Sequence, residues 1–116
     1  MQTTGRLATA DVEIGGKQIK AGQAVTLRLG AANRDPAQFP EPDRLDLTRP
    51  DNRHLAFGYG IHFCVGAPLA RLEAELAFSA LLRRLPGLRL DAAELTWDRS
   101  VVFRGLTRLP LSFDPA

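Results

Sequence analysis

The stretch from residue 57 to 73, FGYGIHFCVGAPLARLE, constrains the fold more than any other part of this sequence. Three glycines in the loop permit backbone angles and close approaches that a Cβ atom would prevent, so the loop leaves room for a flat or bulky group. Pro68 suits the first turn of a helix, because its missing N–H would have no partner there. The pattern predicts an open loop that delivers the only cysteine, Cys64, to a helix beginning at about Ala67. The loop glycines are Gly58, Gly60 and Gly66.

Cys64 stands where the expected helix lacks a Ser, Thr, Asp or Asn to cap its first turn. Its sulfur is therefore a candidate acceptor for the first N–H groups of that helix. The positive end of the helix dipole would favour a thiolate, which is either a nucleophile or a soft metal ligand. We interpret Cys64 as a metal ligand, against the alternative of a buried structural thiol.

The composition limits the class of protein. A chain of 116 residues with 45% hydrophobic content is long enough for one modest domain. A net charge of +2 gives no reason to expect nucleic acid as a partner. One cysteine excludes an internal disulfide and fits a cytoplasmic location. Met1 is followed by polar residues, and no run of 18 apolar residues occurs, so we expect neither a leader nor a membrane span.

The chain before the loop predicts a small antiparallel sheet followed by a long meander. Residues 6–19 have the pattern of a hairpin that turns at Gly15–Gly16, and residues 24–29 alternate as a half-buried strand. From residue 30 to 56 the periodicity disappears, apart from a short helical turn expected at 31–34, and four prolines punctuate the segment. The apolar face expected for the second strand consists of Val25, Leu27 and Leu29.

The helix expected over residues 67–85 carries two apolar stripes, which predicts burial on two sides. Pro86–Gly87 ends it, and apolar residues at 101–103 and 106–113 bracket Gly105 in an expected final hairpin. One stripe consists of Leu69, Leu72 and Leu76, and the other of Ala70, Ala74, Ala77, Phe78, Leu81 and Leu85.

The loop FGYGIHFCVG resembles the haem-binding loop of the cytochrome P-450 family, with Phe, Gly, a basic residue, Cys and Gly at every fixed position. The segments AANRDP and FPEPDRLDLTR before it, and GAPLARLE and RGLTRLPL after it, continue the resemblance in the same order. His62, two residues before the cysteine, is similar to the soluble bacterial branch of the family. The resemblance covers nearly the whole chain.

The resemblance implies a role for each loop residue. Cys64 matches the proximal thiolate ligand of haem iron, which favours O–O cleavage by pushing electron density toward the metal. Phe57 matches the aromatic residue beside the sulfur, and Gly58 and Gly66 match glycines that let the backbone lie close to the porphyrin.

Three cationic residues also match the family. His62 and Arg6 correspond to partners of the haem propionates, and charge-assisted hydrogen bonds to carboxylates are the stronger kind. Arg49 corresponds to an arginine that the family pairs with a Glu and an Arg of an upstream ExxR helix. Two segments correspond to the family's C-terminal substrate contacts: Gln2, Thr3 and Thr4, and Val102 and Phe103.

The resemblance implies that residues 1–116 are an α+β-looking C-terminal segment of the mainly α P-450 fold, comprising sheet, meander, cysteine-ligand loop, long helix and terminal hairpin. The distal helix and the ExxR helix have no counterpart here, so the catalytic residues are unassigned, and the chain is expected to be a truncated product or one with a misassigned start. The intact enzyme is expected to bind haem b and to insert one oxygen atom of O₂ into a small organic substrate.

The arginine-rich surroundings of the loop predict a positive patch on the thiolate side, which would receive electrons from an acidic, ferredoxin-like protein; a solvated basic rim is the alternative. Three other readings of the chain stay open. It could be a remnant that binds no haem, a thiol enzyme in which His62 activates Cys64, or a zinc protein using Cys64, His62 and His54. The residues of the expected patch are Arg53, His54, Arg71, Arg83 and Arg84.

Overall fold

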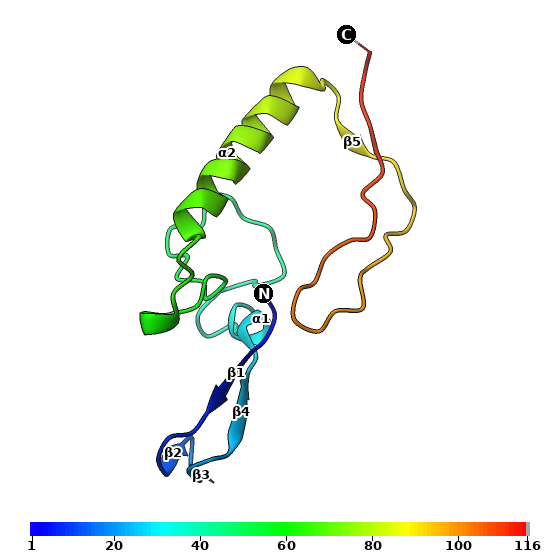
Figure 1. Cartoon of the computed structure of the whole chain (residues 1–116). Helices are drawn as coiled ribbons and strands as arrows, with labels where there is room; N and C mark the ends of the chain where they lie inside the picture. The colour runs from blue at the N-terminus through cyan, green and yellow to red at the C-terminus, as the bar shows by residue number, and fades with distance from the viewer. Residues whose placement is uncertain (116) are drawn as a thin grey trace. The chain divides into compact units, whose positions relative to one another are not determined.

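The computed structural model describes residues 1–115 (Figure 1). The chain divides into two compact units. The first comprises residues 1–58 together with 101–103, and the second comprises residues 59–100 together with 104–115. Among the described residues, no helix is long and apolar enough to cross a membrane.

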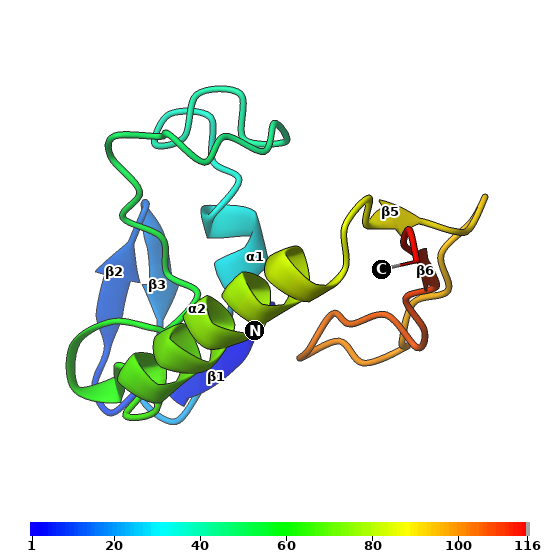
Figure 2. The same ribbon diagram turned by 90° about the horizontal axis from the view of Figure 1, so that it is seen from above.

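Two small antiparallel ladders form the start of the first unit. Strand β1 (Thr4–Leu7) pairs with β4 (Ala24–Leu27), and β2 (Val12–Ile14) pairs with β3 (Lys17–Ile19), as Figure 2 shows for the second pair. The turn between β2 and β3 is Gly15–Gly16, with φ of 56° and 73°, which are the positive values that a two-residue hairpin turn requires. The predicted turn and the two strands beside it are confirmed, but residues 6–7, which the prediction included in this hairpin, belong to β1 and pair with β4 in a separate ladder.

The expected strand over residues 24–29 is too long by two residues. β4 ends at Leu27, and Leu29 begins the short helix α1 (Leu29–Ala32) rather than sharing the apolar face of a strand. The chain turns at this point because the Arg28 carbonyl accepts hydrogen bonds from the N–H groups of Ala31 and Ala32. Leu29 is only 7% exposed and is one of the few buried apolar residues of the chain.

The meander that follows has no helix or strand among its described residues until Gly60, as the prolines predicted. Phe39 anchors it, with only 8% of its surface exposed. A side chain replaces secondary structure in one place, where Asn33 Oδ1 accepts the Leu55 N–H at 2.7 Å across 22 residues of sequence. Buried backbone groups need such partners, so this bond fixes where the meander approaches the loop.

The second unit is built on the long helix α2 (Ala67–Arg84), which matches the predicted helix within one residue. The short 3₁₀ helix η1 (Gly60–His62) precedes it. Gly87, at φ of 63°, follows its end, which agrees with the predicted stop.

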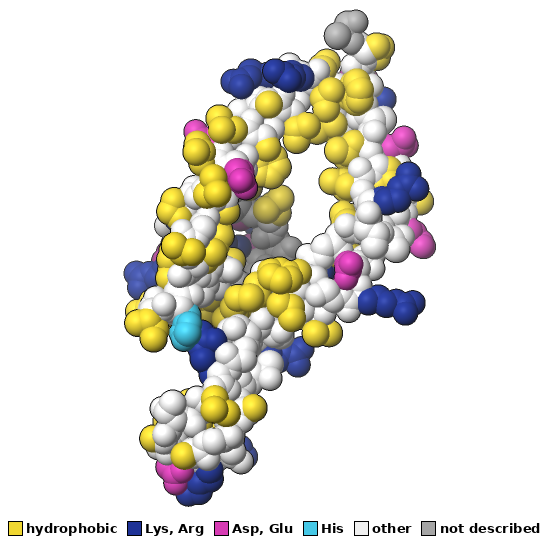
Figure 3. Space-filling view, viewed as in Figure 1, with side chains coloured by type: hydrophobic (Ala, Val, Ile, Leu, Met, Phe, Trp, Pro, Cys, Tyr) yellow, Lys and Arg dark blue, Asp and Glu magenta, His cyan; other side chains and the backbone are white. Residues whose placement is uncertain are grey.

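Helix α2 is not buried on two sides within this chain. Ala67 is its only buried residue, and Figure 3, viewed as in Figure 1, shows hydrophobic side chains on the surface over the helix. Both predicted stripes contribute to this surface, since Leu76 is 61% and Phe78 is 65% exposed. The stripes predict burial on two sides, but little of this sequence is left to cover both of them, and in agreement the described residues leave both stripes largely exposed.

The end of the chain also pairs differently from the prediction. β6 (Leu111–Ser112) pairs with β5 (Arg89–Leu90), so the partner of the final strand directly follows α2. Residues 101–103 lie in the loop between the two halves of this ladder. Closer to that loop, a single antiparallel bridge joins Trp97 to Leu106.

Candidate functional site

The loop before α2 is shaped by two glycines with positive φ. Gly58 has φ of 79° and donates its N–H to the Leu55 carbonyl at 2.9 Å, which closes a turn at the end of the first unit. Gly60 has φ of 64° and begins η1, in which the Phe63 N–H reaches the Gly60 carbonyl at 3.0 Å. Side chains with a Cβ atom are strained at such angles, so both positions require glycine.

Cys64 lies three residues before the first residue of α2. Its carbonyl oxygen accepts the Ala67 N–H at 3.1 Å, and the N-cap residue Gly66 provides no side-chain cap. The expectation that the Cys64 sulfur caps the helix is therefore wrong, because the backbone of the same residue serves instead. The thiol is free and exposed.

Gly66 keeps the space beside the sulfur open. A Cβ atom placed on Gly66 would lie 3.8 Å from Cys64 Sγ, which is ordinary van der Waals contact. A methyl group would thus fit beside the sulfur, and glycine leaves this position without a side chain.

The side chains that flank the thiol are apolar and face solvent. Ile61 and Val65 are each 98% exposed, and Phe63 is half exposed. Exposed apolar side chains next to the cysteine in the sequence are typical of a surface that a ligand or another segment covers. Among the described residues, no three His, Cys, Asp or Glu side chains gather to hold a metal ion. A single sulfur donor suits a metal that brings its other ligands with it, and in haem the porphyrin does so.

Arg6 lies on β1, opposite Val25 of β4, and is half-buried. Its Nη1 donates to the Gly5 carbonyl at 2.7 Å and to Thr4 Oγ1 at 3.2 Å. These two bonds use one nitrogen of a guanidinium group that carries five N–H donors, so Arg6 is held in place with donors left for a carboxylate. His62, the other expected propionate partner, is exposed at the end of η1 in the second unit.

Phe57 is half-buried at the end of the first unit. Its ring lies 6.0 Å from the His54 ring, at an interplanar angle of 54°. His54 Nδ1 accepts the Ala56 N–H at 3.2 Å, which orders the turn that carries Phe57. This contact gives His54 a structural role, which sequence reasoning missed.

The two expected substrate segments come together in the first unit. The Gln2 N–H donates to the Val102 carbonyl at 2.7 Å, and Thr3 Oγ1 donates to the Val101 carbonyl at 3.4 Å. The Gln2 carbonyl in turn accepts the Gly30 N–H at 2.9 Å, which ties the residue to α1. Residues nearly one hundred positions apart in sequence therefore lie side by side in the first unit. Sequence patterns gave no signal for this contact.

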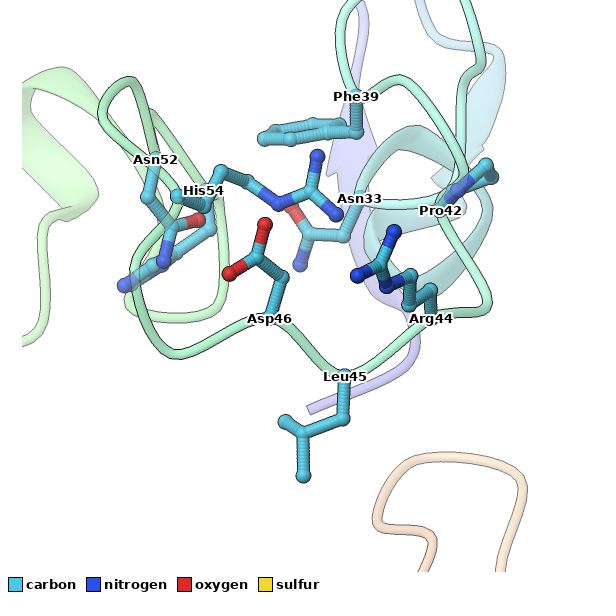
Figure 4. A pocket seen from close by; sticks show the side chains of 9 residues that line it. Asn33, Phe39, Pro42, Arg44, Leu45, Asp46, Asn52 and His54 are labelled. Atoms are coloured by element: carbon cyan, nitrogen blue, oxygen red, sulfur yellow. The ribbon is translucent and has the colours of Figure 1, made fainter.

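A polar hollow of about 190 Å³ lies in the meander (Figure 4). Arg49 lines it and donates to the Pro40 carbonyl at 2.8 Å and to the Glu41 carbonyl at 3.4 Å. Asp46 also lines it, and hydrogen bonds from the Thr48 hydroxyl and N–H, together with the charge of Arg49, lower the pKa of its carboxyl below the ordinary value. Arg49 is thus held by the meander itself.

The residues of the expected positive patch are divided between the two units. Arg53 and His54 belong to the first unit, and Arg53 Nε pairs with Asp51 Oδ1 at 3.1 Å. Arg83 and Arg84 lie in the last turn of α2, where basic side chains interact favourably with the helix dipole.

Comparison with known proteins identifies the family. The family model described as Cytochrome P450 matches residues 1–89. This chain belongs to the cytochrome P450 family. It is 51% identical over 115 residues to the 6-deoxyerythronolide B hydroxylase of Saccharopolyspora erythraea, a match that covers 97% of this chain and 28% of that protein. It is 50% identical over 108 residues to the mycinamicin IV hydroxylase/epoxidase of Micromonospora griseorubida, covering 91% of this chain and 27% of the relative.

Solved P450 structures share the fold of the chain. The structure of P450BioI in complex with an acyl carrier protein ligated to hexadec-9Z-enoic acid superposes with a TM-score of 0.92 at 49% identity, covering 97% of this chain and 29% of that one. CYP109E1 from Bacillus megaterium in complex with testosterone gives a TM-score of 0.93 at 38% identity, covering 98% and 32%. The P450 chain described here thus spans less than a third of the relatives that it matches. The cytochrome P450 family implies haem as its cofactor.

Proposed function

We propose that this chain is the C-terminal segment of a haem-thiolate monooxygenase and that it supplies the proximal face of the haem site, with Cys64 as the ligand of the iron. The observation that carries the proposal is the exposed Cys64 thiol, which a glycine loop presents among exposed apolar side chains at the start of α2. The family match makes haem the natural ligand for that surface.

Haem, when bound, supplies the iron that activates O₂, and the intact enzyme inserts one oxygen atom into an organic substrate while the other becomes water. The part played by this chain would be to present the Cys64 sulfur to the iron. The loop does so directly before α2, whose first N–H groups have no side-chain cap. Gly66 places no side chain beside the sulfur, and Gly58 lets the backbone turn near the porphyrin.

The cationic side chains would hold the propionates. Arg6 is a preorganised donor because two bonds to its own strand fix its guanidinium group. His62 would provide a second donor from the end of η1. Phe57 would pack beside the ligand loop, and the ring contact with His54 orders it for that role.

The substrate would contact the edge formed by Gln2, Thr3 and Thr4 together with Val102 and Phe103. The hydrogen bonds between these two segments support this assignment, since they form one surface within a single unit. Relatives at similar identity carry names that refer to different products, such as biflaviolin and biotin, so the similarity does not select one substrate.

We further propose a cytoplasmic, ferredoxin-like protein as the electron donor of the intact enzyme. The basic side chains of α2 favour an acidic partner, since opposite charges steer association. Upstream helices of the intact protein would cover the apolar stripes of α2, and one of them would bring the Glu and Arg that pair with Arg49.

The proposal is tested by the absorption spectrum of the full-length protein that contains this sequence, recorded after its haem is reduced and carbon monoxide is added. We expect the red-shifted Soret band of a thiolate complex, its loss in Cys64→Ala, and its retention in Glu13→Gln, which alters an exposed side chain of the β2–β3 hairpin. A Cys64→Ala protein that keeps the thiolate-type band would refute the ligand assignment. An absence of haem in the unaltered protein would favour the remnant, and rapid alkylation of Cys64 without a haem spectrum would favour the thiol enzyme.

A further inference from the structure

The loop between residues 98 and 105 is closed at its base by a short run of backbone bonds in the second unit. The Asp98 N–H donates to the Gly105 carbonyl at 2.8 Å, and the Thr107 N–H donates to the Thr96 carbonyl at 3.0 Å. Both bonds flank the bridge between Trp97 and Leu106. The base of the loop is therefore a small antiparallel ladder of very few residues, which is marginal by itself.

A side-chain contact reinforces this ladder. The guanidinium carbon of Arg104 lies 4.1 Å from the centroid of the Trp97 ring, which is well inside the range of a cation–π interaction. Trp97 is the only tryptophan of the chain, and it is 45% exposed, so burial in a core does not explain its presence. Arg104 directly follows Phe103, the last residue of the expected substrate segment.

The opposite side of the loop is fixed as well. Asp98 Oδ1 accepts the Ser100 N–H at 2.6 Å and so shapes the first residues after the ladder. The tip, residues 101–103, packs with the first unit, where the Val102 carbonyl accepts the Gln2 N–H. The loop is thus constrained at its tip by backbone bonds and at its base by the ladder and the ring contact.

We propose that Trp97 and Arg104 form a clamp that positions Val102 and Phe103 for substrate contact. This inference rests on the proposed function of those two residues. The clamp closes the chain at residues 97 and 104, so it shortens the segment that can move freely and lowers the entropy lost when the tip is held in one place. Trp97 and Arg104 are positioning residues and do not touch the substrate.

Two measurements on the full-length haem protein test the clamp. Hydrogen exchange of the amides at 100–103 reports the mobility of the loop. The dissociation constant of 4-phenylimidazole is measured from the Soret band. This ligand reports on the substrate side of the haem, because its phenyl ring extends beyond the iron. Imidazole lacks the phenyl ring and is the matched control ligand. We expect Trp97→Leu and Arg104→Gln each to raise the exchange rate and to weaken 4-phenylimidazole by about two- to five-fold, the ratio that corresponds to a partly exposed cation–π contact. Imidazole should bind unchanged.

Conservative variants and a control separate the clamp from general stability. Arg104→Lys keeps a cation over the ring and should behave as the unaltered protein. The effects of Trp97→Phe should be intermediate between those of the unaltered protein and of Trp97→Leu, because indole is a stronger cation–π partner than phenyl. The double variant should be no worse than either single variant, since the contact is lost once. Arg99→Gln removes an exposed arginine of the same loop and should change nothing.

The clamp is overturned if Arg99→Gln has the same effect as Arg104→Gln, if the double variant is fully additive, or if faster exchange leaves 4-phenylimidazole binding unchanged. Val102→Ala separates this failure from that of the proposed function. If Val102→Ala alters 4-phenylimidazole binding and the clamp variants do not, the assignment of the substrate edge is supported and the clamp is refuted. If Val102→Ala also has no effect, the assignment of the substrate edge itself is wrong.

Discussion

Replacing Phe39 by alanine tests whether the meander depends on one buried ring. Phe39 is 8% exposed, so folding removes nearly its whole side chain from water. A phenylalanine buries about 200 Å², which at about 25 cal/mol per Å² corresponds to about 5 kcal/mol. Residual compactness of the unfolded chain lowers this figure to about 3–4 kcal/mol, within the range of about 3–5 kcal/mol for such truncations.

The matched control is Gln38→Ala, because Gln38 belongs to the same meander and has an exposed, polar side chain. Its loss should change the free energy of unfolding by less than about 0.5 kcal/mol. Urea unfolding of both variants in the full-length protein, followed by circular dichroism with hydrogen exchange at residues 33–58, measures the difference. A Phe39→Ala loss below about 1 kcal/mol, or an equal loss in both variants, would show that the ring does not anchor the meander.

Three further outcomes are expected. Gly60→Ala should lower haem retention and reduce the free energy of unfolding by about 1–2 kcal/mol, because Gly60 has φ of 64°. Gly105→Ala is the control and should change neither quantity, because Gly105 has no positive φ and no atom lies near the added Cβ. Equal haem retention in both variants would contradict this. The pKa of Asp46 is lowered, so its ionised form stabilises the fold at pH values above about 4, and this contribution disappears as the pH falls through the lowered pKa. Asp46→Asn should therefore flatten the acid limb of a pH–stability curve. An unaltered acid limb would show that the Thr48 hydrogen bonds to Asp46 do not stabilise the fold. Charge reversal at Arg71 and Arg83 should slow reduction by a ferredoxin, with a difference that shrinks as salt increases; reduction kinetics that do not change in stopped-flow measurements would exclude the proposed surface.

Local signals predicted those elements whose residues decide their own conformation. Gly15–Gly16 can form the positive-φ turn of the β2–β3 hairpin with few competitors, and Pro68 with the stop at Gly87 defined α2. Leu29 was assigned to the wrong element because an apolar residue continues a strand pattern and also suits the start of a helix. The choice was made by the Arg28 carbonyl and by the contact of Gly30 with Gln2.

Pairings between distant segments were beyond local signals. β5 has two residues and no alternation that would mark it as the partner of β6. For the site, the sequence predicted where Cys64 lies relative to α2, but the backbone carbonyl took the capping role expected of the sulfur, since a carbonyl at that position already has the right geometry. The approach of Gln2 to Val102, and that of Arg104 to Trp97, depends on the folded path of the chain and left no periodic trace.

The large exposed surface of this chain, to which the stripes of α2 contribute, affects how the chain responds to heat and denaturant. Its accessible surface is 9920 Å², whereas a self-contained protein of 12.7 kDa exposes about 6,200 Å² and its unfolded chain about 18,400 Å². Folding of the chain by itself thus buries about 70% of the surface that a self-contained domain of this mass would bury. Denaturant m-values and the heat-capacity change of unfolding scale with that buried surface, so both should be about 30% smaller than chain length suggests. The isolated chain should therefore unfold over a broad range of urea concentration. Packing of the upstream helices on the apolar stripes of α2 should narrow that range.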